Sequence, residues 1–115
     1  MPDKRQVVLF QTLADPTRLA IFEHLSRGEA TVSTLTDRFP ISQPAVSQHL
    51  AVLRQCGLVA HRREGRSAIY QARPEGLAPL TNWLTHYRSF WPERLDRLKN
   101  LLATQSQAQS EGDKE

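Results

Sequence analysis

The chain has 115 residues, of which 39% are hydrophobic and 23% are charged, and it carries a formal net charge of +3 and one cysteine. This composition is typical of a single globular domain. It excludes an internal disulfide framework and a multi-cysteine zinc finger, and no apolar run approaches the roughly 20 residues that span a bilayer. The opening MPDKRQ lacks the apolar stretch of a signal peptide, so we expect a cytoplasmic protein.

The apolar residues between Val7 and Leu13 predict a short first helix. Asp15-Pro16 is a typical start for a second helix, because the carboxylate can accept from free backbone N–H groups and proline suits the first turn. Gly28 is expected to end that helix. Thr31 is the expected N-cap of a third helix, which Pro40 stops.

A fourth helix is predicted to begin after Ser42, its expected N-cap. The apolar residues of one side recur at helical spacing: Val46, Leu50 and Leu53. Gly57 is placed to end this helix in a left-handed cap. Because only a tight connection at residues 39–42 separates the third and fourth helices, the pair resembles a helix-turn-helix.

After the fourth helix the pattern becomes strand-like. Two β-prone arms, Leu58 to Arg63 and Ser67 to Ala72, flank residues 64–66 and predict a hairpin with a positively charged tip. The span from Arg38 to Arg73 holds six basic residues against one acidic residue, Glu64. This excess predicts a polyanionic partner, most simply nucleic acid.

The C-terminal part predicts one long amphipathic helix. Leucine and aromatic residues step by three or four from Leu77 to Leu102, and Pro92 is expected to kink or break the helix near Phe90 to Pro92. Residues 105–115 are polar and are expected to form a disordered tail after one domain, residues 1–104. A core this small often gains stability by pairing, so a homodimer is expected.

Four motifs in this order resemble the ArsR family of bacterial winged-helix repressors: Asp15-Pro16-Thr17-Arg18-Leu19, SQPAVSQHL at 42–50, LRQCGLV at 53–59 and the EGR hairpin. The likeness covers roughly residues 7 to 102. It implies a mainly α fold with a small β-hairpin, a winged helix-turn-helix that dimerises through its first and last helices. The fourth helix would enter the major groove of DNA, and the hairpin would be the wing.

The outward side of the fourth helix explains why residues 42–50 carry no formal charge. Base edges are read by hydrogen bonds, for which glutamine and serine are suited, and small residues allow close approach. The family pattern and the helical wheel, with the arginines of the hairpin, predict the DNA-binding residues Ser42, Gln43, Pro44, Ser47, Gln48, His49, Arg62, Arg63 and Arg66. His49 lies at the margin of the core side, so a packed histidine is an equal alternative.

The predicted dimer-interface residues are Val8, Leu9, Trp83, Tyr87, Phe90, Trp91, Leu95 and Leu98. The block WLTHYRSFWPERLDRLKNLL resembles a branch of the family without obvious sensor sites, whose members often repress their own operons. An alternative for these aromatic residues is a pocket for a small organic effector.

No metal site, cofactor or catalytic group is predicted. The stretch of the third helix, EATVSTLTDRF, lacks the paired cysteines of the family's thiolate sites. The family's other common site uses carboxylate and imidazole ligands on the last helix, and here no second histidine follows His86. A site built from His86 across a dimer axis is a minor alternative. Cys56 is alone, which favours a packed side chain over a redox switch. No nucleophile and base are suitably spaced, so an enzyme is not expected.

The sequence therefore predicts a sequence-specific transcriptional regulator, a repressor that binds a palindromic operator in double-stranded DNA as a homodimer. Two alternatives are a non-specific architectural DNA-binding protein and a winged-helix module that binds other proteins. A minor alternative is a sensor repressor that responds to a metal, an oxidant or a small organic ligand.

Overall fold

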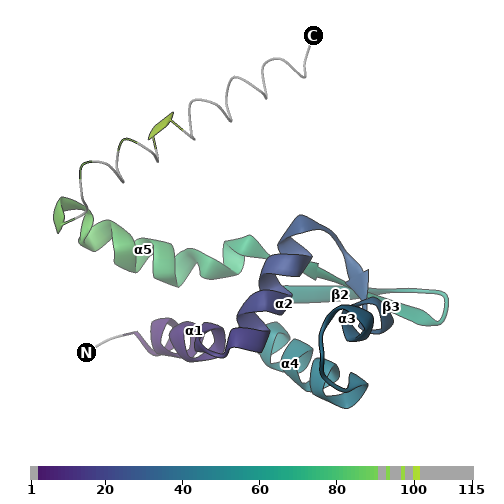
Figure 1. The fold of residues 1–115 in the computed structure, drawn as a ribbon. Coiled ribbons are helices and arrows are strands. Elements are labelled where there is room, and N and C mark those ends of the chain that lie inside the picture. Colours follow the sequence, from purple (N-terminus) through teal and green to yellow (C-terminus); the bar gives the residue numbers. More distant parts are fainter. Residues whose placement is uncertain (1–2, 91–92, 94–96, 98–99, 102–115) are drawn as a thin grey trace, which may run out of the picture. The chain divides into compact units, whose positions relative to one another are not determined.

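A computed structural model describes residues 3–90, 93, 97, 100 and 101, and the chain divides into two compact units, residues 1–83 and 84–115. The described elements are, in chain order (Figure 1), α1 (Lys4–Ala14), α2 (Pro16–Arg27), β1 (Ala30–Thr31), α3 (Val32–Arg38), α4 (Gln43–Gln55), β2 (Val59–Glu64), β3 (Ser67–Ala72), a 3₁₀ turn (Pro74–Leu77), α5 (Ala78–His86) and a second 3₁₀ turn (Arg88–Phe90). None of the helices in this described part has the length and apolar content needed to cross a membrane.

The three predicted N-caps are confirmed. Asp15 Oδ1 accepts from the backbone N–H groups of Thr17 and Arg18, at 2.9 and 3.0 Å. Thr31 and Ser42 cap α3 and α4 through their side-chain oxygens. Each cap satisfies backbone donors that have no partner within the first helical turn, which fixes where the helix begins.

The predicted left-handed cap of α4 is also confirmed. Gly57 has a φ of 81°, its N–H donates to the carbonyl of Arg54 at 3.1 Å, and the N–H of Leu58 donates to the carbonyl of Leu53 at 3.0 Å. These two bonds are those of a Schellman motif. Gly76, in the first 3₁₀ turn, lies directly against this cap, because a Cβ there would be 2.2 Å from the carbonyl oxygen of Gly57.

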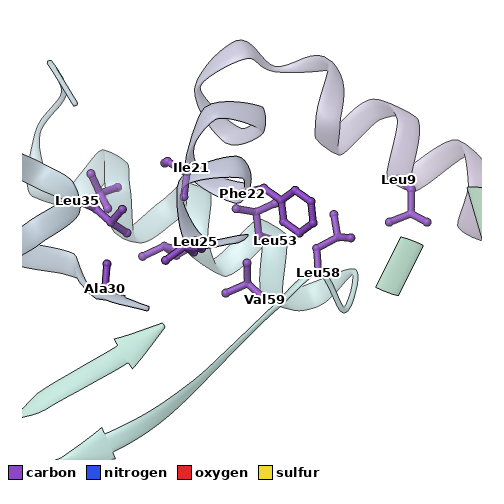
Figure 2. Close-up of a cluster of buried hydrophobic side chains, with 11 residues drawn as sticks. Leu9, Ile21, Phe22, Leu25, Ala30, Leu35, Leu53, Leu58 and Val59 are labelled. Carbon is purple, nitrogen blue, oxygen red and sulfur yellow. The ribbon is translucent and has the colours of Figure 1, made fainter. Parts of the chain in front are cut away.

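The core lies in the first unit, between the helices and the base of the hairpin (Figure 2). Its buried apolar residues are Leu9, Ile21, Phe22, Leu25, Ala30, Leu35, Val46, Leu50, Leu53, Leu58 and Val59. The three residues predicted for the buried side of α4 have no exposed surface. Their complete burial fixes the rotation of α4 about its axis.

The sheet has three antiparallel strands in the order β1-β3-β2. The hairpin was predicted, but its turn is one residue shorter than expected: Glu64 pairs with Ser67, and Gly65 has the positive φ of 61°. β1 was not predicted. Its two residues pair with Tyr70 and Ile69, and a strand of that length has no period for a sequence pattern to detect.

The predicted long C-terminal helix is interrupted earlier than expected. α5 ends at His86, and the following 3₁₀ turn is held by bonds to the third residue back, including one from the Phe90 N–H to the Tyr87 carbonyl at 2.9 Å. The break therefore begins before Phe90, where the expected kink started. Pro92 and the predicted tail, residues 105–115, lie outside the described residues.

Candidate nucleic-acid interface

The outward side of α4 is exposed and uncharged, as the sequence predicted. We call this surface the reading face: Ser42, Gln43, Pro44, Ser47, Gln48 and Ala51. It lies opposite the buried side, which faces the core. The loop after α3 is closed by a hydrogen bond from the Ile41 N–H to the Phe39 carbonyl at 2.8 Å. A tight turn thus joins α3 to a helix that offers amides, hydroxyls and small side chains to solvent.

His49 differs from its neighbours on α4 because it is only partly exposed. It lies close enough to the N-cap of α2 to act on Asp15. The backbone N–H of Arg18 lowers the pKa of the Asp15 carboxyl most, against partial burial, and the charges of Arg18 and His49 lower it further. The His49 side chain is therefore less accessible to a ligand than the side chains of the reading face are.

Arg62 is engaged by two carboxylates. Its guanidinium donates to Glu29, which precedes β1, and to Glu64 on its own strand, the latter with Nη2 3.2 Å from Oε1. The hydrogen bond to Glu29 raises the pKa of Arg62 and lowers the pKa of Glu29. Sequence reasoning missed the partner because Glu29 is 33 residues away from Arg62, beyond any local pattern.

Arg63 and Arg66 have no hydrogen bond or ion pair with the described part of the chain, and both are exposed. Side chains alternate between the two faces of a strand, so Arg63 shares the face of Val59, which is buried against the helices. Arg66 lies in the hairpin turn and lines a shallow groove of about 180 Å³ with the first residues of α3. Two unpaired cations therefore lie on the wing, which projects from the helices (Figure 1).

The residues that were predicted to form a dimer interface differ in their exposure. Val8 is 47% exposed, whereas Leu9 is 2% exposed and belongs to the chain's own core. Phe10 is exposed instead, and its ring meets that of Trp83 edge to face, with centroids 5.3 Å apart. The sequence did not separate Leu9 from Phe10 because apolar residues are consecutive in α1 and fit more than one buried side.

In the second unit, Tyr87 and Phe90 are exposed and their ring centroids lie 6.4 Å apart. The remaining predicted interface residues, Trp91, Leu95 and Leu98, lie outside the described residues. Within residues 3–90, 93, 97, 100 and 101, no three His, Cys, Asp or Glu side chains are grouped as metal ligands would be.

Comparison with known proteins agrees with this geometry. Residues 15–61 match the family model described as bacterial regulatory protein, arsR family. The chain is 42% identical over 104 residues to the HTH-type transcriptional regulator Rv2034 of Mycobacterium tuberculosis, which covers 90% of this chain and 89% of the relative. It is also 42% identical over 71 residues to a probable mercury resistance operon repressor of Streptomyces lividans, covering 62% of this chain and 57% of that protein.

A solved structure of an ArsR-like transcriptional regulator from Rhodococcus sp. RHA1 has a TM-score of 0.67 and 32% identity, covering 84% of this chain and 92% of the other. The family match begins at the N-cap of α2 and ends in β2, so it contains the helix-turn-helix. The relative from M. tuberculosis is matched over nearly its whole length. The chain therefore belongs to the arsR family of bacterial regulatory proteins, and it is a DNA-binding transcriptional regulator with a winged helix-turn-helix fold.

Proposed function

We propose that this protein is a homodimeric repressor that binds a palindromic operator through α4 and the hairpin. The reading face carries the proposal, because an exposed helix side without charge, next to a cationic hairpin, suits base edges beside a phosphate backbone. Regulation requires only that the protein occupy a promoter and block the polymerase. Such a protein acts on DNA in the cytoplasm.

The residues of the reading face have distinct roles in this proposal. Gln43 and Gln48 can each make a bidentate contact with adenine, and Ser47 can bond to a base or a phosphate. Pro44 is small enough to let the helix approach a thymine methyl group. Ser42 Oγ accepts from the Ala45 N–H, which leaves its hydroxyl hydrogen free to donate to a phosphate.

The wing supplies the part of the affinity that does not depend on base sequence. Arg63 and Arg66 are exposed and unpaired with the described part of the chain, so they can neutralise phosphates without first breaking an ion pair. Arg62 must exchange two carboxylates for a phosphate. We therefore assign Arg62 mainly to holding the wing and the other two arginines to DNA.

Dimerisation is proposed through α1 and the C-terminal helical segment. Val7, Val8 and Phe10 on α1 are between 38% and 47% exposed, and apolar residues so close together favour association. Tyr87 and Phe90 are exposed in the second unit. A two-fold dimer would place its paired recognition helices about 34 Å apart, one turn of B-DNA.

The test is a footprint on the DNA upstream of the gene, centred on any inverted repeat found there. We expect a discrete protected site with two-fold symmetry. Gln48→Ala should lose about 1 to 3 kcal/mol at one base position in each half-site. Gln55→Ala is the matched control, because Gln55 is also an exposed glutamine on the same side of α4 but lies two turns beyond Gln48, in the last turn of the helix.

The alternatives make different predictions in the same experiment. A non-specific architectural protein would protect no discrete site, and Gln48→Ala would then behave like Gln55→Ala. A module that binds other proteins would show no steep fall of DNA affinity with salt. Either result would overturn the proposed repressor.

A further inference from the structure

A pocket of about 260 Å³ lies in the first unit, between the N-terminal half of α1, the end of α4 and the start of α5. Its apolar wall is formed by Val8, Leu9, Cys56 and Pro79. Leu9 is fixed in the core, and Cys56 is partly buried, with Sγ 3.4 Å from the carbonyl oxygen of Leu53. The pocket is distinct from the reading face, because no residue of that face lines it.

Part of the lining of the pocket is backbone. Gly76 contributes no side chain to it. Its Cα is held against the C-terminal cap of α4, where a Cβ would be 2.2 Å from the carbonyl oxygen of Gly57. This close contact packs the backbone of the 3₁₀ turn against the end of α4.

Positive charge lies at the rim of the pocket. Lys4 and Arg5 both line it, and both are exposed. Arg5 is paired with Asp3, with Nε 3.8 Å from Oδ1, whereas Lys4 has no ion pair or hydrogen bond within the described residues. One positive charge is therefore left without compensation beside an apolar wall.

We propose that this pocket binds a small organic monoanion with a compact apolar body, such as a medium-chain carboxylate. Ligand pockets usually measure about 300 to 1,000 Å³, and the volume of about 260 Å³ lies just below that range, which suits a small ligand. The apolar body would lie against Val8 and Pro79, and the carboxylate would lie at Lys4. Gln55, also in the lining, offers an amide that can donate to the second carboxylate oxygen.

The probe is octanoate, compared with 1-octanol, which has the same apolar chain without the charge. Binding is measured by calorimetry on the full chain, and occupancy is measured by the rate at which iodoacetamide alkylates Cys56. Because Cys56 is the only cysteine, every alkylation event reports on the pocket. We expect octanoate to bind and to slow alkylation, and 1-octanol to bind more weakly.

A variant without the two positive charges at the rim tests their role, and a second variant, which loses a positive charge elsewhere, is its control. Lys4→Gln combined with Arg5→Gln should weaken octanoate binding by roughly tenfold, as expected for two partly exposed ion pairs. Arg27→Gln is the control, because it removes an exposed arginine from the end of α2, outside the pocket. Circular dichroism should show unchanged folding in all variants, since the three side chains are exposed.

Three results would overturn the proposal. The first is no octanoate binding with unchanged alkylation. The second is equal binding of 1-octanol and octanoate in both the wild type and the doubly neutral variant, which would mean that the site has no preference for an anion. The third is alkylation that is slow without ligand and becomes fast on dilution, because a second copy of the chain would then fill the pocket. None of these measurements uses DNA, so their outcome does not depend on whether the protein binds an operator; the third result would assign Val8 and the pocket to the proposed dimer interface instead.

Discussion

The backbone at Gly76 lies so close to the C-terminal cap of α4 that an alanine side chain does not fit. A Cβ at this position would be 2.2 Å from the carbonyl oxygen of Gly57, 2.8 Å from its carbonyl carbon and 3.3 Å from the Cα of Leu58. All three atoms are backbone. No flexible side chain can turn away to relieve the overlap, so either the 3₁₀ turn or the cap must shift.

The expected cost of Gly76→Ala follows from this overlap. Overpacking usually costs about 1 to 3 kcal/mol, and a clash with two backbone atoms belongs at the upper end of that range. In a domain of this size, each 1 kcal/mol lowers Tm by about 4 to 8 °C. We therefore expect Gly76→Ala to lower Tm by more than about 10 °C.

Two other glycines provide matched controls for the same substitution. At Gly57 a Cβ would meet nothing within 4 Å, but the φ of 81° is left-handed, so Gly57→Ala should cost about 1 to 2 kcal/mol. At Gly28 the space is also open and the φ of 173° is extended. Gly28→Ala should therefore be neutral, or stabilising by up to about 1 kcal/mol.

The assay is thermal unfolding and urea unfolding of the wild type and the three variants, monitored by circular dichroism at one fixed protein concentration; the first gives Tm and the second gives the free energy of unfolding. The predicted order of destabilisation is Gly76→Ala, then Gly57→Ala, then Gly28→Ala. If Gly76→Ala were as stable as Gly28→Ala, the close approach of the 3₁₀ turn to α4 would be refuted, and with it the rigid lining of the pocket.

Three further predictions concern single side chains. Arg63→Ala should reduce the slope of log affinity for DNA against log salt by about 0.9 in a salt titration. Arg62→Ala should reduce this slope less, because two carboxylates already neutralise that guanidinium. Equal slopes for the two variants would contradict the assignment of Arg63 to DNA and of Arg62 to holding the wing. The Arg18 N–H holds the pKa of Asp15 below 3.8, so the ionised carboxylate stabilises the fold above about pH 4 and this contribution is lost as the pH falls through the lowered pKa. Asp15→Asn keeps an N-cap, and thermal melts from about pH 6 to about pH 3 should show the Tm difference from the wild type shrinking; a constant difference would count against the pKa shift. Val8→Asp should raise the dimer dissociation constant by roughly tenfold, because a carboxylate in the interface loses water even with Lys4 one helical turn away; an unchanged constant in sedimentation equilibrium would remove Val8 from the proposed interface.

Local physical chemistry determined the parts of this protein that could be predicted from its sequence. The side chains of Asp15, Thr31 and Ser42 accept hydrogen bonds from backbone groups within three residues of themselves. Gly57 adopts the positive φ that ends α4, which a residue without a side chain can do at little cost. Because Val46, Leu50 and Leu53 recur at helical spacing, one side of α4 packs into the core and the opposite side, the reading face, is exposed. Each of these effects acts within one or two helical turns, where a sequence pattern can be read directly.

Contacts between distant segments were decided only by the tertiary structure. Arg62 meets Glu29 because β1 and β2 both pair with β3, and β1 itself exists only as the partner of a strand nearly 40 residues later in the chain. Packing placed Leu9, and not Phe10, in the core. Gly76 closes against Gly57 across the end of α4. Such contacts depend on how the elements pack together, and no period in the sequence of a single element records which other element it will meet.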